Sequence, residues 1–231
     1  MELNKPKFIK DNNTFLTIYG RNLLAELNII LPDNYLIVTM EDLWEKYKHH
    51  FKNKKKNVYI VKGLDINKVD EDFKNLNNFS TIVGIGGGQS LDMAKYFAWK
   101  SGVKLFQVPT SMSVNATFGH RAAIRINSNV SYVGWTVPEA VYVDYDIIKE
   151  APKEFNRSGI CEIMCYHTAH LDWKYATKVG KCEKKWPYDQ SAVNEAKSVL
   201  NYMLEGIDDI KEVNDNGIIR LMNANSWGGP A

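Results

Sequence analysis

The sequence lacks the features of a secreted or membrane-spanning protein. No apolar run approaches the ~20 residues that cross a bilayer, and the first ten residues contain no apolar signal-peptide core. The chain has only three cysteines, Cys161, Cys165 and Cys182, and no C-x-x-C pair, which argues against a disulfide framework or a cysteine-based zinc module. Cys161 and Cys165 lie four residues apart, and we expect them to be small buried side chains of a helix. We therefore predict a reducing, cytoplasmic location and no membrane partner.

A charge excess of one sign is also absent. The chain has 29 Lys and Arg against 27 Asp and Glu, a net charge of +2. This balance gives no reason to expect a nucleic-acid partner. The one basic run, residues 52–56, has no aromatic residues among its lysines, so we interpret it as a solvated helix end and loop. Repeats and low-complexity tracts are missing, and 45% hydrophobic residues in 231 are enough for a core in one or two domains.

The first half of the chain alternates short apolar strands with helical patterns. Strands are predicted at 35–39, 57–61, 81–85 and 104–108, and helices at 43–51, 69–76 and 90–100. This alternation is typical of an α/β domain with a parallel sheet. Three further short strands, at 122–126, 132–135 and 140–143, are expected to extend the same sheet.

The second half has helical spacing throughout. Helices are predicted at 155–179, 191–210 and 217–227, with Gly, Asp and Asn at the breaks. We therefore divide the chain into an α/β domain over residues 1–150 and an all-helical domain over residues 151–231.

Three consecutive glycines, Gly86, Gly87 and Gly88, join a predicted strand to a predicted helix. Such a turn presents free backbone N–H groups and the positive end of the helix dipole, which together bind phosphate. The glycine spacing differs from G-x-G-x-x-G, so the ordinary Rossmann fingerprint does not apply, and a tight turn without a ligand is the alternative. We predict a nucleotide phosphate site, on the same rim of the sheet as the loop over residues 109–120.

Several motifs occur in a fixed order along the chain. They are G-I-G-G-G-Q-S-L-D-M-A-K at 84–95, V-P-T-S-M-S-V-N-A at 108–116, H-R-A-A-I at 120–124, V-D-Y-D-I-I-K-E-A-P at 143–152, R-S-G-I-C-E at 157–162 and H-L-D-W at 170–173. Together they resemble the dehydroquinate synthase-like superfamily, which includes the iron- or zinc-dependent alcohol, glycerol and glycerol-1-phosphate dehydrogenases. The resemblance is strongest to the glycerol-1-phosphate dehydrogenase-like branch. It implies a Rossmann-like dinucleotide-binding domain followed by a helical domain, with the active site between them.

The resemblance implies NAD or NADP as the cofactor. The matching cofactor-binding positions are Gly86, Gly87, Gly88, Gln89, Ser90, Asp92, Thr110, Ser111 and Ser113. A hydrophilic turn is the alternative for the segment after Pro109, and a weak surface ion pair with Lys95 is the alternative for Asp92. Glu41, at the end of a predicted strand, favours NAD over NADP.

The resemblance also implies a substrate-side loop and a metal ligand. Asn115, His120 and Arg121 are the candidate catalytic residues, although the dehydrogenases usually have an aspartate where this chain has Asn115. Arg121 can meet a phosphate on the substrate or the cofactor. Glu162 matches the family's first ligand for Zn or Fe, and an acid favoured by a helix N-terminus is the alternative.

Two further metal ligands of the family, both histidines, come from beyond the segment that this chain matches. The resemblance therefore predicts a C-terminally truncated chain with an incomplete metal site. His170 lies eight residues after Glu162, about 12 Å along a helix, which is too far for both to bind one metal. His167 and His170 are either a metal pair of their own or ordinary helix histidines. Apolar helical residues that lack partners, such as Trp186 and Leu204, invite dimerisation.

These observations predict a metal-dependent NAD(P) oxidoreductase that interconverts a small polyol phosphate or alcohol and its ketone. One alternative is a dehydroquinate synthase-like lyase that closes a carbocycle with bound NAD, which the glutamate at position 162 favours. Another is a nucleotide-binding fragment without catalytic activity.

Overall fold

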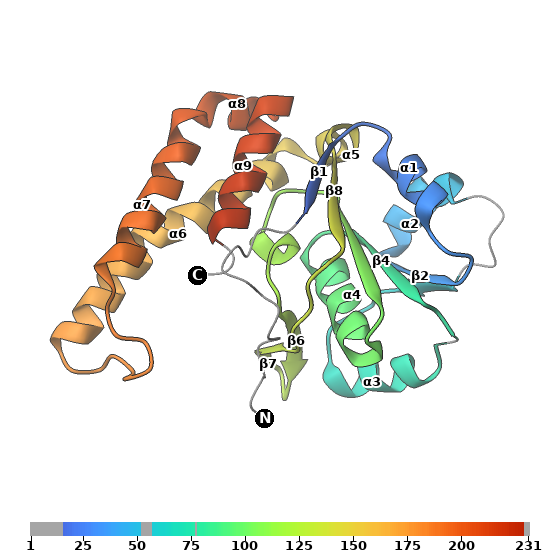
Figure 1. The fold of residues 1–231 in the computed structure, drawn as a ribbon, viewed down its shortest axis with the longest axis horizontal. Helices are drawn as coiled ribbons and strands as arrows, with labels where there is room; N and C mark the ends of the chain where they lie inside the picture. The colour runs from blue at the N-terminus through green and yellow to red at the C-terminus, as the bar shows by residue number, and fades with distance from the viewer. Residues whose placement is uncertain (1–15, 52–56, 77, 229–231) are drawn as a thin grey trace.

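The structure, a computed structural model, describes residues 16–51, 57–76 and 78–228. Its centre is a parallel six-stranded sheet (Figure 1). The strand order is β1 (Thr17–Gly20), β8 (Ala140–Asp144), β5 (Lys104–Pro109), β4 (Thr81–Gly86), β2 (Tyr35–Thr39) and β3 (Asn57–Ile60). The predicted α/β class and the four predicted central strands are confirmed.

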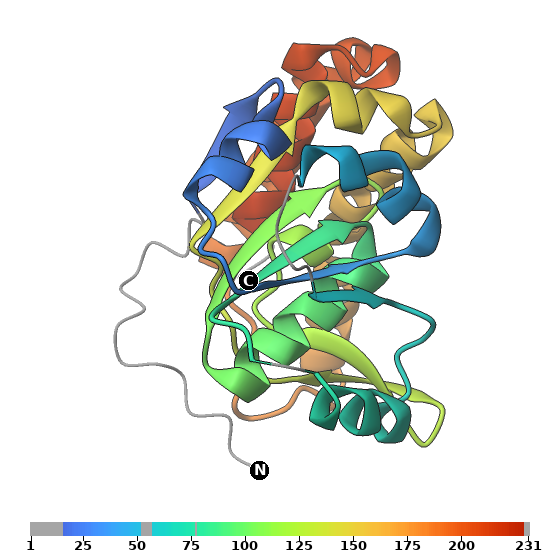
Figure 2. The same cartoon turned by 90° about the vertical axis from the view of Figure 1, so that its right-hand side faces the viewer.

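Helices cover both faces of this sheet, as the two views in Figures 1 and 2 show. One face holds α1 (Leu23–Ile30), α2 (Glu41–Tyr47) and the short helix η1 (Lys48–His50), and the other holds α3 (Ile66–Lys74) and α4 (Gly88–Ser101). Strand β2 shows why both faces need to be covered: successive side chains of a strand point to opposite faces of the sheet. Tyr35 and Ile37 pack with α1, whereas Leu36 and Val38 pack with α4. Both sets are buried, which explains the continuous apolar run in the sequence.

The segments 122–126 and 132–135 do not extend the main sheet, so that prediction is wrong. Strands β6 (Ala122–Ile126) and β7 (Asn129–Val133) form a separate antiparallel hairpin. Its two turn residues, Asn127 and Ser128, have φ angles of 51° and 66°, the backbone that a two-residue hairpin turn needs. Ala122 and Ile124 are buried in the cluster that contains α4. Of the three predicted additions, only the segment 140–143 joins the sheet.

The helical part begins directly after β8. It consists of α5 (Tyr145–Glu150), α6 (Lys153–Lys178), α7 (Gln190–Glu205), α8 (Ile207–Glu212) and α9 (Asp215–Gly228). Figure 1 shows α6 and α7 as a hairpin that projects away from the sheet. The helix predicted over 191–210 is two helices, because Gly206 separates α7 from α8. Met203 and Leu221 share a buried cluster with Val143 of β8, so the helices and the sheet have a common core.

A tight contact holds α6 against the loop that follows β5. A Cβ atom on Gly159 would lie only 1.9 Å from the Met112 carbonyl oxygen, so the two backbones touch at a position that only glycine allows. One turn earlier, Asn156 is 0% exposed. Its Oδ1 accepts the N–H of Met112 at 3.0 Å, and its Nδ2 donates to the Ile148 carbonyl at 2.7 Å. The α5–α6 corner and the β5 loop are therefore fixed to one side chain.

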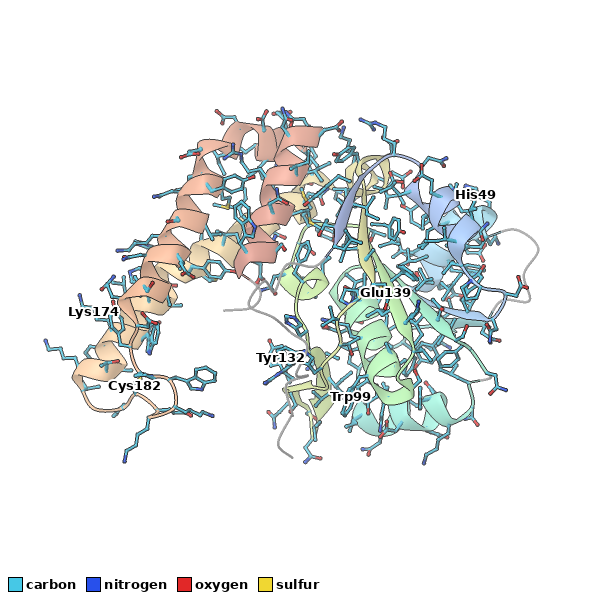
Figure 3. The ribbon with its side chains drawn as sticks, viewed as in Figure 1. His49, Trp99, Tyr132, Glu139, Lys174 and Cys182 are labelled. Atoms are coloured by element: carbon cyan, nitrogen blue, oxygen red, sulfur yellow. The ribbon has the colours of Figure 1, made fainter. Side chains whose placement is uncertain are left out.

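Cys161 and Cys165 are exposed, so the expectation that they are buried is wrong. They lie on a face of α6 that also carries the exposed Met164. Cys182, labelled in Figure 3 at the far end of the α6–α7 hairpin, is half-buried and donates from Sγ to the Trp186 carbonyl at 2.9 Å. The basic run at 52–56 lies outside the described residues. Among the helices of the described part, none has the length and apolar character to cross a membrane.

Candidate active site

The glycine turn lies where β4 ends, at the carboxyl edge of the sheet. Gly86 has a φ of 146°, and a Cβ atom there would lie 2.6 Å from Ser90 Oγ. Both the backbone angle and the close contact require glycine. The Gly86 carbonyl accepts the N–H of Thr110 at 3.0 Å, so the turn is joined to the loop after β5.

Helix α4 begins at this edge of the sheet, directly after the glycine turn. Its first bond runs from the Leu91 N–H to the Gly87 carbonyl at 3.1 Å, and Gly87 provides no side-chain cap. The N–H groups of residues 88–90 precede that bond and can bind a ligand. Two hydroxyls, Ser90 Oγ on α4 and Thr39 Oγ1 at the end of β2, are buried without a hydrogen-bond partner among the described residues. Buried polar atoms of this kind normally have a partner, so the edge is suited to a polar ligand.

The predicted cofactor residues of the β5 loop come close to this turn. Ser111 Oγ is the nearest atom to a Cβ built on Gly87, at 3.7 Å, and it lies 3.1 Å from Ser113 Oγ. Three hydroxyl residues, Thr110, Ser111 and Ser113, are thus held beside the start of α4. The geometry fits a dinucleotide, whose diphosphate and ribose are bound by backbone amides and hydroxyls.

The alternative for Asp92, a surface ion pair with Lys95, is wrong because the pair is buried. Lys95 is 1% exposed, and its Nζ lies 2.7 Å from Asp92 Oδ1. The same Nζ donates to the carbonyls of Ala116, Gly119 and Arg121 at 2.9, 3.0 and 2.9 Å. Burial lowers the pKa of Lys95 and raises the pKa of Asp92, and the charge of each partner opposes the shift of the other. We assign the pair as ionised, because only an ammonium has three donors for three carbonyls.

One cavity of about 840 Å³ is lined by seven of the predicted site residues, whereas the predicted cofactor residues Gly86, Gly87, Ser90, Thr110, Ser111 and Ser113 are not part of its lining. Its walls include Gly88, Gln89 and Asp92 from α4, Asn115, His120 and Arg121 from the following loop, and Glu162 from α6. Tyr132 of β7, labelled in Figure 3, and Trp186 of the α6–α7 loop also line it. The volume is in the range of a cofactor or substrate pocket. Three segments that are far apart in the sequence thus meet at one cavity.

Comparison with known proteins gives the family. The sequence profile described as iron-containing alcohol dehydrogenase matches residues 21–152. The chain belongs to the iron-containing alcohol dehydrogenase family. It is 31% identical over 190 residues to the glycerol-1-phosphate dehydrogenase [NAD(P)+] of Methanococcus aeolicus, which covers 80% of this chain and 52% of that protein. The protein of the same name from Sulfolobus acidocaldarius is 30% identical over 184 residues, with 77% and 52% covered. The chain spans about half the length of these curated relatives.

Solved structures show the same fold. Glycerol dehydrogenase from Schizosaccharomyces pombe superposes with a TM-score of 0.68 at 17% identity, covering 93% of this chain and 61% of that one. A probable glycerol dehydrogenase from Sinorhizobium meliloti gives 0.72 at 16% identity, covering 92% and 63%. The predicted Rossmann-like domain followed by helices is therefore confirmed as the fold of iron-containing alcohol dehydrogenases.

The substrate-side residues of this family member differ in exposure. His120 is buried and stacks on Trp135, with ring centroids 4.4 Å apart and an interplanar angle of 15°. The Arg121 side chain is exposed at the cavity, although its carbonyl is bound to Lys95. Asn115 begins the short helix η2 (Asn115–Thr117). The loop therefore presents a buried, stacked imidazole beside an exposed guanidinium.

Tyr166, one helical turn after Glu162, escaped the sequence analysis. Burial first, and then the negative charge of Glu162, raise the pKa of its hydroxyl. A side-chain hydrogen bond with Asn115, on the substrate-side loop, opposes this rise. The i, i+4 spacing from Glu162 was the one available signal, and it does not by itself distinguish a site residue from a packing residue.

The residues that the structure describes do not form a complete metal site. Across residues 16–51, 57–76 and 78–228, no three His, Cys, Asp or Glu side chains converge as ligands. The rings of His167 and His170 have centroids 5.5 Å apart, and His170 Nδ1 lies 3.0 Å from the Tyr166 carbonyl oxygen. His170 lines a different cavity, of about 680 Å³ between α6 and α7. Glu162, the predicted metal ligand, lines the 840 Å³ cavity, and of the other residues with ligand-type side chains Asp92 and His120 line it too.

Proposed function

We propose that this chain is the cofactor-binding and substrate-facing part of a metal-dependent NAD(P) oxidoreductase that interconverts a small polyol phosphate or alcohol and its ketone. Residues 1–150 form the dinucleotide-binding domain, and residues 151–231 belong to the helical domain. One observation supports this most: the first residues of α4, Gly88 and Gln89, line the same cavity as Asn115, Arg121 and Glu162. The names of the curated relatives agree with this substrate class.

The residues around the glycine turn fit a bound NAD or NADP. The first-turn amides of α4 and its dipole hold the diphosphate, and the hydroxyls of Ser90, Ser111 and Ser113 bind phosphate or ribose oxygens. Thr110 keeps the turn in place through its bond to Gly86. When bound, the nicotinamide accepts or returns the hydride. Gln89 and Asp92 line the part of the cavity next to α4.

The opposite part of the cavity fits a phosphorylated polyol. The Arg121 guanidinium offers a planar pair of donors to a phosphate, and the Asn115 amide can hold a hydroxyl. His120 is held in one orientation by Trp135, which suits a group that moves a proton to or from the substrate oxygen. Glu162 provides one carboxylate for Zn or Fe, and the other ligands would have to come from outside the described residues.

Calorimetric titration with NADH and with NADPH, each with and without Zn²⁺, tests this proposal. The decisive variant is Gly87→Val. The backbone at Gly87, φ −89°, suits any residue, and a Cβ there would meet only Ser111 Oγ at 3.7 Å. The variant should therefore fold while its side chain blocks the approach of a diphosphate.

We expect binding by the natural chain and a loss of about tenfold or more in Gly87→Val, the equivalent of one charge-assisted hydrogen bond. Gly63→Val is the matched control, because a Cβ at Gly63 would meet no atom within 4 Å. Equal affinities for all three proteins would place the nucleotide elsewhere. Absence of binding to the natural chain would contradict the cofactor assignment.

A further inference from the structure

The loop over residues 115–121 has little regular structure of its own. It contains one short helix, η2, and it carries all three substrate-side candidates. Within the loop, the N–H groups of Phe118 and Gly119 donate to the Asn115 carbonyl at 2.9 and 3.2 Å. These two bonds close a turn, but they do not attach the loop to the rest of the protein.

One side-chain atom on α4 attaches the loop at three points. Three carbonyls of the loop segment, at positions 116, 119 and 121, accept from Lys95 Nζ within 3.0 Å. Lys95 is almost fully buried, and its counter-charge Asp92 is on the same helix, three residues earlier. Hydrogen bonds from a charged donor are about twice as strong as neutral ones, and the low local dielectric strengthens them further.

We propose that Lys95 is the positioning residue of this active site: its ammonium gathers the 115–121 loop and sets where Asn115, His120 and Arg121 lie in the cavity. Lys95 is a positioning residue and not a catalytic one, since four acceptors, the three loop carbonyls and Asp92, already share its three donors. The assignment of the loop as the substrate wall rests on the proposed function. The attachment of the loop to Lys95 does not.

One helix thereby serves both halves of the site. The first turn of α4 faces the predicted diphosphate position, and Lys95, about two turns further along, holds the substrate-side loop. The Lys95 carbonyl also accepts from Thr136 Oγ1 at 3.1 Å, and the Thr136 N–H donates to the His120 carbonyl at 2.9 Å. The segment after the β6–β7 hairpin is therefore joined to the same residue.

The first test measures hydrogen–deuterium exchange of the unliganded protein, resolved by peptide. Lys95→Met keeps the length of the side chain but removes the ammonium, and it leaves Asp92 buried without its partner. The double variant Asp92→Asn/Lys95→Met removes that charge as well. We expect exchange in 115–121 to become about tenfold faster or more in both variants, because charge-assisted bonds to the loop are lost. Exchange in α7, which makes no contact with Lys95 through a hydrogen bond or ion pair, should be unchanged.

The double variant decides the interpretation. If it restored natural exchange in the loop, the ion pair with Asp92 would be responsible and the proposal would be overturned. Acceleration spread equally over α7 and the sheet in both variants would also overturn it, because that result describes general destabilisation. Should Lys95→Met alone fail to fold, the double variant provides the comparison.

A second test uses sn-glycerol 1-phosphate as the probe, titrated in the presence of NADH. Arg121→Ala should weaken its binding about tenfold in the natural background but have almost no effect in the Lys95→Met background, where Arg121 is already misplaced. Equal losses in the two backgrounds would contradict the positioning role. If the natural chain does not bind the probe, the proposed substrate class fails, while the exchange measurement still decides the role of Lys95.

Discussion

Replacement of Asn156 by alanine tests how α6 is held on the α/β domain. The variant removes two buried hydrogen bonds, from Met112 N–H to Oδ1 and from Nδ2 to the Ile148 carbonyl. The Met112 N–H, in a residue that is 0% exposed, is left without a partner and without easy access to water, whereas the Ile148 carbonyl still accepts the Ala151 N–H at 3.3 Å. An unsatisfied buried group costs about 1–3 kcal/mol.

The expected loss of stability follows from these two groups. The unsatisfied Met112 N–H costs about 1–3 kcal/mol and the lost bond to the Ile148 carbonyl about 0.5–1.5 kcal/mol, which gives about 1.5–4.5 kcal/mol together, and entry of a water molecule into the vacated space would bring the loss toward the lower value. A domain is stable by only about 5–15 kcal/mol, so the change is large. Because Met112 lies between Ser111 and Ser113, we also expect the affinity for NADH to fall.

Urea unfolding followed by circular dichroism measures this loss. Asn194→Ala is the matched control: Asn194 is an exposed residue of α7, and its replacement should change the free energy of unfolding by no more than about 0.5 kcal/mol. A loss below about 1 kcal/mol for Asn156→Ala would refute the reasoning. It would mean that apolar packing alone holds α6 and that the Met112 N–H finds water.

Three further outcomes are expected. Arg121→Ala should weaken binding of a phosphorylated substrate by about tenfold or more without changing the melting temperature, and unchanged affinity in calorimetry would remove its role. The hydrogen bond from Lys149, together with the charges of Lys149 and Arg21, lowers the pKa of Asp215. The ionised Asp215 therefore stabilises the folded protein fully above about pH 3.9, the pKa of an unfolded aspartate, and this stabilisation is lost as the pH falls through the lower pKa of Asp215 in the folded protein. Asp215→Asn should therefore melt slightly below the natural chain at about pH 7, by under about 1 kcal/mol, and together with it near pH 2. The exposed apolar side chains of the helical hairpin and its loop, such as Trp186 at 65% and Leu204 at 46%, should cause self-association, and a purely monomeric mass by light scattering at high concentration would contradict this.

The sequence predicts the central strands β2, β4 and β8 well because they are buried on both faces. Each appears as a continuous apolar run, as in Tyr35–Thr39, whose predicted and observed limits agree. Strand β1, only four residues long, is too short to show a period, and the sequence analysis missed it together with α1. The hairpin was assigned to the wrong sheet because its partner strand depends on the turn at Asn127 and Ser128, whose positive φ angles have no periodic signal.

The sequence indicates which residues belong to the candidate site, but not how deeply they are buried or what they contact. The spacing of Asp92 and Lys95 is the same for a solvated helix pair and for a buried one, and only the tertiary fold places the β5 loop over Lys95. Likewise, Cys161 and Cys165 have the spacing of a buried helix face, but the described residues provide no element that covers it. The spacing of residues in the sequence indicates which side chains share a helix face, whereas the burial of that face depends on which other segments pack against it.

The position of β1 beside β8 has a consequence for the order of folding. The first strand of the described chain pairs with the last strand of the sheet, and Tyr19 Oη also donates to Asn223 Oδ1 of α9, 204 residues away. Loop closure over such a separation is slow and costs entropy. During synthesis, β1 has no partner until β8 has emerged, so the interior of the sheet can form first and this edge closes last.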